Sequence, residues 1–458
     1  MTSDPAVRYW LKCINDDCGA TYAPEKFMDT CPRCGGLFLL ERDEDLIDNE
    51  VGIGQQARDY FDNIRFGRGR DTYPYGSGVF MWLAHILPGF PEESVISLQE
   101  GFTDLFKTPE WLQRRVGLKN LFIKMEGQLP SHSFKDRGLS VAVSEAHRLQ
   151  KTYPEQNIRF VACASTGDTS ASAAIYSAYE ESLHCLVLLP DERVSEEQLY
   201  QAMAHGATVL SIKHPDGFDA CMNLVEEFCS RHSEIVLVNS KNAFRIVGQE
   251  TIALEICQDL RWKAPDWISI PCGNGGNLTA LLTSLRRMER RGLIDKVPGI
   301  IVAQAKSANT LVRWGRSGFK DYAPGSSRGE TVATAMDIQN PVSFPRIKKL
   351  VPGFKMAFYD VSEEDIQQTR AIFMSAGANI CPQSAVALDA VLQARRDGVV
   401  KEDDVVTSIS TASGVKFFRS GLAYVSKEGN PHANPPRVVN GSVEDIENAV
   451  RHLAGVNF

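Results

Sequence analysis

The sequence predicts an α/β protein with mostly parallel sheets, because short apolar runs of strand character alternate with longer runs of helical character. Small-residue turns join several of the strand-like runs to the next helix-like run. We expect strands at residues 121–125, 159–163, 185–189, 208–213, 235–238, 267–270, 299–303 and 405–409. We expect helices at residues 139–149, 171–179, 196–205, 218–231, 248–260, 278–288, 363–376 and 441–455.

The last helix and two internal stretches need separate comment. The last helix begins with Ser442 and has an acid three residues later, Asp445, which is the form of a capping box. Residues 315–345 are rich in glycine, serine and proline and are predicted to be loop. Residues 45–95 show no clear periodicity, so no element is assigned to them.

Composition is ordinary for a globular protein and excludes some classes of partner. With 458 residues, 43% hydrophobic and 23% charged, the chain is long enough for two or three domains. The net charge of −8 argues against nucleic acid as the main partner, because binding phosphates requires clustered Lys and Arg. No apolar run reaches the ~20 residues that cross a bilayer, and the polar N-terminus is not followed by the apolar core of a signal peptide. We therefore expect no membrane partner and a cytoplasmic location.

One lysine is placed at a strand-to-helix junction. Lys135 lies in the sequence Ser-Phe-Lys-Asp-Arg-Gly at 133–138, between the runs 121–125 and 139–149. A lysine there can be held half-buried at the mouth of a cleft, where loss of hydration favours the neutral, nucleophilic amine. Most lysines are instead solvated surface groups, so Lys135 alone is weak evidence for catalysis.

Two further loops have the composition of anion-binding sites. Residues 164–170 and 271–277 each follow an expected strand and open an expected helix. Free backbone N–H groups and the helix dipole attract anions at such turns, and glycines permit close approach. Either loop alone would pass for an ordinary connection. Together with Lys135, the two loops indicate a site that holds two anions around an amine.

Four of the eleven cysteines cluster near the N-terminus. Cys13-x4-Cys18 is followed by Cys31-x2-Cys34, and a glycine comes after each pair. The glycines let backbone N–H groups turn toward sulfur, and four thiolates suit tetrahedral zinc in a structural role, with no open coordination position. The first pair departs from the usual C-x2-C spacing, so unligated cysteines are the alternative interpretation.

Five motifs resemble those of the pyridoxal-phosphate (PLP) enzymes with the tryptophan-synthase β fold, also called fold type II, and within them those of the threonine synthases. The motifs are S-F-K-D-R-G at 133–138, the small-residue loop at 165–170, the glycine-rich loop at 273–277, N-S-K-N-A-F-R with G-Q-E-T at 239–251, and the segment 330–341. The resemblance spans roughly residues 95–420. It implies two open-sheet α/β domains with the cofactor between them.

The resemblance also implies where the domains lie. A small α/β domain is expected at 141–235, and a large PLP-binding α/β domain at 46–140 plus 236–430. The zinc-ribbon-like module would occupy 1–45, and a C-terminal extension with a helix would occupy 431–458.

The family motifs assign roles to residues of this chain. By resemblance, Lys135 holds PLP covalently and moves protons once the substrate has released it. The other residues implied to bind the cofactor are Asp168, Gly273, Asn274, Gly275, Gly276, Asn277 and Thr411. Those implied to bind the substrate are Ser133, Ser165, Thr166, Thr169, Asn239, Ser240 and Arg245, the last as a bidentate partner of a phosphate.

The sequence departs from the family motifs in three loops. Asp168 stands where the family has asparagine, Ala412–Ser413 replace Gly-His after Thr411, and Phe102 and Asp104 interrupt the usual E-G-N-T-P-L. An ionised Asp168 cannot donate the hydrogen bond that asparagine gives to the phenolic oxygen of PLP. We therefore expect either a protonated Asp168 or a cofactor that keeps its own proton.

Three functions remain open on the sequence alone. The first is that of the threonine synthases, carbon–oxygen lyases that convert O-phosphohomoserine and water to threonine and phosphate by γ-elimination and β-addition. The second is that of a related lyase or synthase acting on O-phosphoserine or another phosphorylated amino acid, as in cysteate synthase. The third is a non-catalytic binding or zinc-scaffold protein, which the intact Lys135 disfavours. The family resemblance implies a homodimer.

Overall fold

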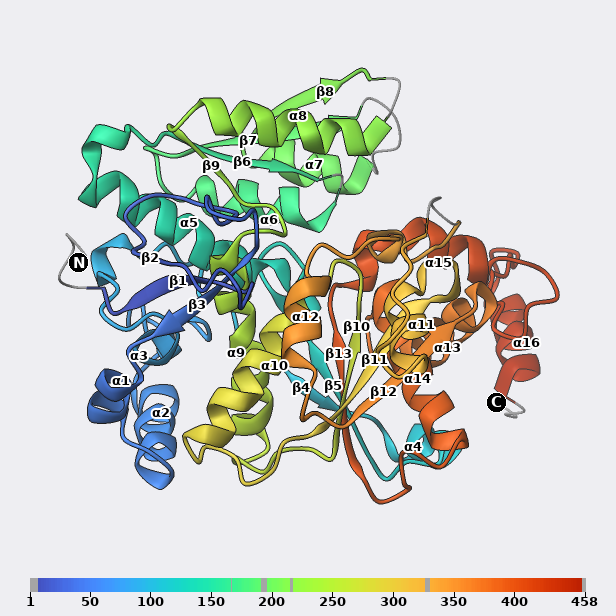
Figure 1. Ribbon diagram of the computed structural model, residues 1–458. Coiled ribbons are helices and arrows are strands. Elements are labelled where there is room, and N and C mark those ends of the chain that lie inside the picture. Colours follow the sequence, from blue (N-terminus) through green and yellow to red (C-terminus); the bar gives the residue numbers. More distant parts are fainter. Residues whose placement is uncertain (1–6, 166, 191–195, 215–216, 326–329, 455–458) are drawn as a thin grey trace. The chain divides into compact units, whose positions relative to one another are not determined.

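The computed structural model describes residues 7–165, 167–190, 196–214, 217–325 and 330–454. The chain divides into two compact units, Met1–Phe417 and Phe418–Phe458. The first unit contains three sheets, and the second contains α15 (Phe418–Val425) and α16 (Val443–Ala454) (Figure 1). Among the described residues, no helix is both long enough and apolar enough to cross a bilayer.

The largest sheet has six strands in the order β12-β11-β10-β13-β5-β4. Its strands are β4 (Leu105–Lys107), β5 (Asn120–Met125), β10 (Trp267–Pro271), β11 (Gly299–Ala305), β12 (Met356–Val361) and β13 (Val405–Ser410). All neighbours are parallel except the edge strand β4, which runs antiparallel to β5. Three strands that are far apart in sequence, β10, β13 and β5, therefore lie side by side and end at the same edge.

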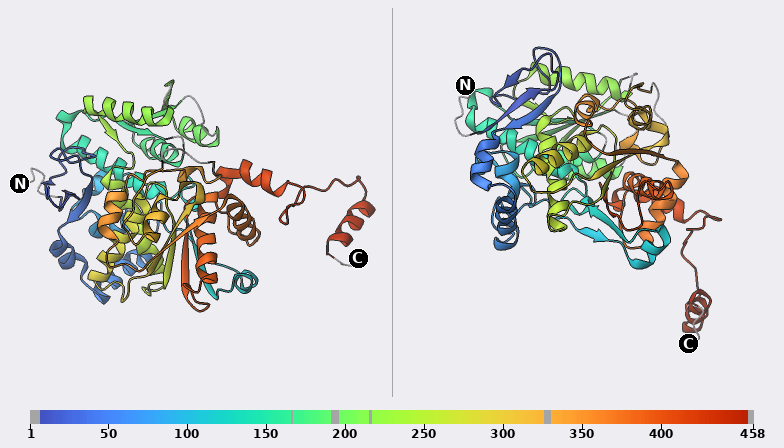
Figure 2. Two further views of the ribbon diagram at one scale, coloured as in Figure 1. Left: turned by 45° about the vertical axis from the view of Figure 1, so that its right-hand side comes forward. Right: turned by 60° about the horizontal axis from the view of Figure 1, so that its bottom comes forward.

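A second sheet has four parallel strands in the order β8-β7-β6-β9. Its strands are β6 (Phe160–Ala164), β7 (His184–Pro190), β8 (Thr208–Ile212) and β9 (Ile235–Leu237). The helices around it are α5 (Lys135–Thr152), α6 (Asp168–Ser177), α7 (Glu196–Ala204) and α8 (Gly217–Arg231). This sheet with its helices lies beside the six-stranded sheet in every view (Figures 1 and 2).

The N-terminal residues form a small antiparallel sheet in the order β2-β1-β3. Its strands are β1 (Tyr9–Cys13), β2 (Thr21–Tyr22) and β3 (Phe38–Arg42). The remaining helices of the first unit are α1 (Glu44–Val51), α2 (Gln55–Gly67), α3 (Leu83–Ile86), α4 (Glu110–Val116), α9 (Ala243–Asp259), α10 (Gly276–Arg290), α11 (Thr310–Arg316), α12 (Phe344–Leu350), α13 (Glu363–Ser375) and α14 (Pro382–Arg396).

The two faces of the six-stranded sheet belong to different apolar clusters, because successive side chains of a strand point to opposite faces. Along β11, Ile300 and Val302 join the cluster that includes residues of α9 and α10. Ile301 and Ala303 join the cluster that includes residues of α14. The sheet is thus a central layer covered by helices on both faces, as a parallel sheet requires.

Helices α5 and α9 cross in direct backbone contact. A Cβ atom added at Gly248 of α9 would overlap the carbonyl oxygen of Arg137, and one added at Gly138 of α5 would lie 2.7 Å from the carbonyl oxygen of Arg245. Only glycine leaves room for two helices at this separation. The crossing therefore fixes how close the first turns of α5 and α9 approach each other.

The strands and helices expected from the sequence are all present, with ends shifted by a few residues. Helices α5, α6, α9 and α10 begin earlier than expected, at Lys135, Asp168, Ala243 and Gly276, which places predicted site residues in their first turns. The capping box of α16 is present, since the Ser442 hydroxyl accepts a hydrogen bond from the Asp445 amide at 3.1 Å. Residues 45–95, left unassigned, contain α1, α2 and α3.

Candidate active site

The predicted site loops come together because the strands that precede them are neighbours. In the six-stranded sheet, β5, β13 and β10 end just before the Lys135 loop, Thr411 and the glycine-rich loop at 273–277. In the four-stranded sheet, β6 and β9 end just before Ser165 and Asn239. The carboxyl ends of parallel strands are where open α/β sheets bind ligands.

The loop of Lys135 and the loop of Thr411 are joined by backbone hydrogen bonds. The Phe134 amide donates to the Thr411 carbonyl at 2.8 Å, and the Ser413 amide donates to the His132 carbonyl at 3.0 Å. Ser133, which is fully buried, is bridged to Ala412 by the same pairing. Two segments separated by almost three hundred residues are therefore held in register beside the amine.

Lys135 is the first residue of α5 and is half-buried. Burial and the positive charges of Arg245 and Lys416 together lower the pKa of its amine to about 7, against the opposing effect of Asp168. The amine also lies 4.2 Å from the centre of the Phe134 ring. A neutral amine near neutral pH is the form needed for attack on a carbonyl and for proton transfer.

Asp168 is the first residue of α6 and forms a buried ion pair that the sequence did not suggest. Its Oδ1 lies 2.7 Å from Nζ of Lys416, and both side chains are less than a tenth exposed. The contact meets the distance of an ion pair but not the angle of a hydrogen bond. Lys416 also donates to the Ser131 carbonyl at 2.9 Å, which ties the ammonium to the Lys135 loop. The pairing therefore places a buried ammonium group against the side chain that stands where the family has asparagine.

Arg245, in the first turn of α9, is a buried guanidinium with no acidic partner among the residues that the structure describes. One terminal nitrogen donates to the Val238 carbonyl at 3.0 Å, and the other lies 3.4 Å from the Thr169 hydroxyl. Its Nε has no acceptor in the described part of the chain. Burial lowers the pKa of Arg245 to about 10. A charged group buried without a counter-ion is stabilised by an anionic ligand.

Other predicted substrate residues surround Arg245. The Asn239 side chain exchanges two hydrogen bonds with the backbone of Ala164, at 3.0 and 3.2 Å, and so holds the end of β6. The Ser165 hydroxyl accepts from the Gly167 amide at 3.2 Å. Ser240 follows Asn239 in the same loop, and its carbonyl faces Arg346. Thr166 lies outside the described residues.

The glycine-rich loop precedes α10, and its surroundings explain its glycines. Gly275 has a left-handed φ of 79°, and a Cβ atom there would lie 2.5 Å from Ile347. A Cβ atom at Gly273 would lie 2.8 Å from the Ala335 carbonyl, so the 330–341 segment packs directly on this loop. The Asn274 carbonyl accepts from the Ser343 amide at 3.0 Å.

The first turn of α10 has polar groups that fit a phosphate. The side-chain nitrogen of Asn277 is buried and has no acceptor among the described residues. Around Gly276 the nearest atom to an added Cβ, Oε1 of Gln249, is 3.8 Å away, which leaves the backbone open to close approach. With Lys135, Arg245 and Thr411, these residues fit PLP: an amine, a phosphate cradle and buried donors without partners.

Thr411 lies in a small network of hydroxyl and thiol groups. Its amide donates to the Ser384 hydroxyl at 2.9 Å, and its own hydroxyl lies 3.6 Å from Sγ of Cys381. Cys381 and Ser384 belong to the start of α14, which was not predicted. The network fixes the backbone of Thr411 at the end of β13.

Asp136 is a further polar residue of the site that had no predicted role. Its carboxylate accepts from the Ser131 amide and hydroxyl at 2.6 and 2.5 Å, and from the Ser172 hydroxyl at 2.6 Å. Burial raises the pKa of Asp136 to about 6 against these hydrogen bonds, which lower it. The residue closes the loop before Lys135 and attaches it to α6.

The altered loop at 99–104 borders a cavity of about 550 Å³ with residues 128–130 on its other side. Phe102 has a left-handed φ of 50°, and its ring lies 5.3 and 5.1 Å from the guanidinium groups of Arg65 and Arg70. Asp104 instead interacts with Gln128. The replacement of the family's Asn-Thr-Pro thus places an aromatic ring between two arginines.

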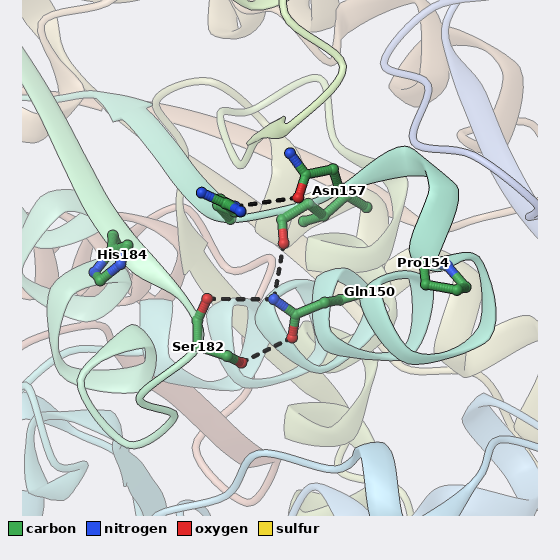
Figure 3. Close-up of a pocket in the computed structure, with 7 residues that line it drawn as sticks. Gln150, Pro154, Asn157, Ser182 and His184 are labelled. Carbon is green, nitrogen blue, oxygen red and sulfur yellow. Dashed lines mark hydrogen bonds between the residues drawn. The ribbon is translucent and has the colours of Figure 1, made fainter.

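A second cavity, of about 340 Å³, lies at the opposite ends of β6 and β7 (Figure 3). Polar groups of its lining form hydrogen bonds with one another. The Gln150 amide donates to the carbonyls of Ile158 and Ser182, and the Ser182 hydroxyl donates back to Gln150. It is remote from Lys135 along these strands, and we do not include it in the site.

The four cysteines form a compact cluster in the N-terminal module. The sulfur atoms of Cys13, Cys18, Cys31 and Cys34 all lie within 4.8 Å of one another. Two of the separations are 3.4 and 3.7 Å, near the ~3.8 Å edge of a tetrahedron with zinc–sulfur bonds of ~2.3 Å. A Cβ atom at Gly36 would lie 3.0 Å from Sγ of Cys13, so this glycine gives the sulfurs room. The residues fit a structural zinc ion.

Comparison with known proteins agrees with this geometry. The family described as pyridoxal-phosphate dependent enzyme matches residues 96–411. The chain belongs to this family, and the predicted fold type II is confirmed.

Its relatives include several threonine synthases. Threonine synthase 2, chloroplastic, of Arabidopsis thaliana is 37% identical over 385 residues, which cover 82% of this chain and 73% of that protein. Threonine synthase of Methanosarcina acetivorans is 33% identical over 444 residues, covering 96% and 98% of the two chains. The crystal structure of threonine synthase from Escherichia coli matches with a TM-score of 0.65 and 20% identity over 95% of this chain and 94% of that one, a likeness of fold.

Proposed function

We propose that the protein is a PLP-dependent threonine synthase, which converts O-phosphohomoserine and water to threonine and phosphate. The observation that carries the proposal is the buried Arg245, a guanidinium that has no counter-ion among the described residues and whose charge acts on the amine of Lys135. The relatives at 33–37% identity, which are threonine synthases, support the same activity.

In this proposal PLP supplies an electron sink for the negative charge that develops on the substrate carbons. Lys135 would hold the cofactor, and its released amine, whose pKa is lowered to about 7, would take protons from the substrate carbons and return them. Arg245 and Thr169 bind the substrate phosphate and stabilise its charge as it leaves. Gly273–Asn277 would hold the phosphate of the cofactor, and the Thr411 hydroxyl would be the donor for its pyridine nitrogen.

Two other predicted substrate residues act through the backbone. Asn239 holds the end of β6 and so positions the Ser165 loop, which with Thr166 and Ser133 would bind the substrate carboxylate. Ser240 belongs to the loop that leads into α9, and its backbone would help to position the first turn of that helix beside the phosphate site. We further propose a structural zinc ion on the four cysteines, a homodimer and a cytoplasmic location.

Replacement of Arg245 tests the proposed reaction. We expect Arg245→Ala to keep the cofactor but to lower kcat/KM for O-phosphohomoserine by about two to four decades, because losing a buried charge-assisted pair costs roughly 3–5 kcal/mol. Arg245→Lys should recover only part of the loss, since a point charge cannot replace the planar fork. Released phosphate and cofactor absorbance are the two measurements.

Because the loop at 99–104 departs from the family motif, O-phosphoserine remains an alternative substrate. Phe102 and its two arginines change the wall of the adjacent cavity, so O-phosphoserine should be assayed beside O-phosphohomoserine. A higher kcat/KM for O-phosphoserine would assign the protein to the related lyases, and an unimpaired Arg245→Ala enzyme would remove the phosphate site.

A further inference from the structure

Arg346, in α12, connects the four-cysteine module with the loop that begins the substrate-phosphate site. Its side chain is fully buried. Nε donates to the Phe38 carbonyl in β3 at 2.8 Å, and one terminal nitrogen donates to the Lys241 carbonyl at 2.7 Å. The other terminal nitrogen lies 3.4 Å from the Ser240 carbonyl. One guanidinium thus binds backbone on two segments that are about two hundred residues apart in sequence.

The module side of this connection lies close to the cysteines. Phe38 pairs with Cys13 across the β1–β3 ladder. Three residues after Arg346, Lys349 donates to the carbonyl of Ile14 at 2.9 Å and pairs with Asp16 at 2.5 Å. Helix α12 therefore contacts the module at the residue paired with Cys13 and at two residues that follow Cys13.

The site side of the connection fixes the peptide groups before α9. In a trans peptide the C=O and N–H bonds point in opposite directions. When Arg346 holds the carbonyls of Ser240 and Lys241, the N–H groups of Lys241 and Asn242 are turned away from it. Asn242 is also the N-cap of α9, accepting from the amides of Phe244 and Arg245. The orientation of the first turn, and of Arg245 within it, depends on this loop.

Helix α12 also supports the glycine-rich loop. Ile347, next to Arg346, packs against Gly275. The Ser343 amide before α12 donates to the Asn274 carbonyl at 3.0 Å. The same seven-residue helix therefore touches the module, the loop of Ser240 and the loop of Gly275.

We infer that Arg346 is a positioning residue through which an ordered four-cysteine module maintains the two phosphate-binding loops of the active site. The inference rests on the proposed function in taking Arg245 as the substrate-phosphate residue. It assigns to the module an effect on ligand binding, in addition to the stability expected of a structural metal site. Removal of the metal or oxidation of its thiolates would then weaken phosphate binding at a distance.

The test compares Arg346→Gln, Arg346→Lys, Cys31→Ser and the double variant Cys31→Ser/Arg346→Gln as full-length holoenzymes. Lys349→Met is the matched control, because Lys349 lies on the same helix and contacts the module but does not reach the Ser240 loop. The measurements are bound zinc per chain, the Kd for inorganic phosphate, and hydrogen exchange of the amides of residues 240–245.

We expect Arg346→Gln to weaken phosphate binding by about tenfold and to speed exchange at 240–245, within the usual range of coupling between sites. Its zinc content should stay near that of the parent, and Lys349→Met should bind phosphate as the parent does. Arg346→Lys should be intermediate. Cys31→Ser should lose zinc and show the same weakening, and the double variant should be no weaker than either single variant.

Additive losses in the double variant, or unchanged phosphate binding and exchange in Arg346→Gln, would overturn the inference. The outcome is separable from that of the proposed function, which is tested by turnover of O-phosphohomoserine. A parent enzyme that binds no phosphate would count against the Arg245 site, whereas exchange at 240–245 would still decide whether the module acts through Arg346.

Discussion

At the scale of single residues, the amine of Lys135 is set by the charges around it. Burial and the cations Arg245 and Lys416 favour its neutral form, whereas Asp168 favours its protonated form. The neutral amine is the reactive form, so its reactivity should rise with pH and level off above its pKa. Ordinary lysines, with pKa values of ~10.4, should continue to gain reactivity at higher pH.

We predict that acylation of Lys135 in the PLP-free protein is half-maximal near pH 7, since burial lowers the pKa of this amine to about 7. Asp168→Asn should move the midpoint to lower pH, because it removes the negative charge that favours the ammonium form. Lys416→Met should move it to higher pH, because it removes a cation and frees the Asp168 charge. Peptide mass spectrometry across a pH series gives the midpoints.

The two opposite shifts are the useful part of that experiment. A loosened fold would expose Lys135 and raise its pKa in both variants, so opposite signs separate a charge effect from damage. Lys135→Ala provides the blank for the labelled peptide and should also lose covalently bound cofactor. Equal midpoints in all variants would mean that Asp168 and Lys416 do not act on the amine.

Sequence motifs indicated candidate residues of the site, but they did not indicate which residues form hydrogen bonds or ion pairs with one another. Lys135, Thr411 and Arg245 were predicted, and the structure places Lys135 in the first turn of α5, Thr411 directly after β13 and Arg245 in the first turn of α9. The partner of Asp168 was missed, because Lys416 is two hundred and forty-eight residues away and nothing in its local sequence marks it as buried. Arg346 was missed for the same reason, since its partners are backbone carbonyls and leave no trace in side-chain patterns.

At the scale of elements, the strongest feature is the charge cluster that holds α5 against α9. Arg137 in α5 donates to Glu126 at 2.5 and 2.8 Å and to Glu255 of α9 at 3.0 and 2.8 Å. All three side chains are fully buried, and Lys124 of β5 also pairs with Glu255 at 2.8 Å. Glu126 and Glu255 share the guanidinium of Arg137, and because the cluster is fully buried, water cannot take its place.

We predict that Arg137→Met lowers the free energy of unfolding by about 3–5 kcal/mol, because it leaves buried carboxylates without their partner. Urea denaturation followed by circular dichroism would measure the change. Lys119→Met is the control: Lys119 pairs with Glu402 and Asp403 at the surface, where its loss should change stability little. A similar small effect for both variants would show that the cluster does not stabilise the crossing.

Periodicity predicted the parallel strands and the long helices but not the shorter elements. Helix α12 has seven residues, and α3 has four, too few for a helical repeat to register. Helix α14 was missed although it has fifteen residues, because it is buried on most sides and lacks a polar stripe. The first turns of α5 and α6 were read as loop because serine, glycine and aspartate favour turns.

At the scale of the whole molecule, the strands of each sheet lie within one of the ranges expected for the zinc-ribbon-like module and the two α/β domains, except at the end of β9. The division into these domains stays a prediction, because its limits at 45 and at 140 fall inside α1 and α5 and the compact units divide after Phe417. The predicted limit between 235 and 236 falls inside β9, which belongs to the four-stranded sheet. We propose that the small domain continues to the end of β9. The clustering of the four cysteines was predictable from their spacing, whereas the contacts of this module with α12 were not, because they depend on how distant segments pack.

We predict that the purified, reduced protein carries about one zinc per chain and that Cys31→Ser with Cys34→Ser removes it. The four sulfurs already lie at separations that suit one tetrahedral ion. Metal analysis by mass spectrometry measures the content, and chelation should lower the unfolding temperature, because binding free energy contributes to folding. Metal-free protein with unchanged stability would favour unligated cysteines.

The crossing of α5 and α9 sets the distance between the Lys135 amine and the Arg245 guanidinium. Lys135 lies three residues before Gly138, and Arg245 lies three residues before Gly248, so the amine and the guanidinium are carried by the two helices that meet there in backbone contact. The span between these groups is therefore set by main chain, and repacking of side chains can alter it little. Discrimination between phosphorylated amino acids that differ by one carbon would then depend on Gly138 and Gly248. An alanine at Gly248 would push the two helices apart and so shift the preference toward the longer substrate.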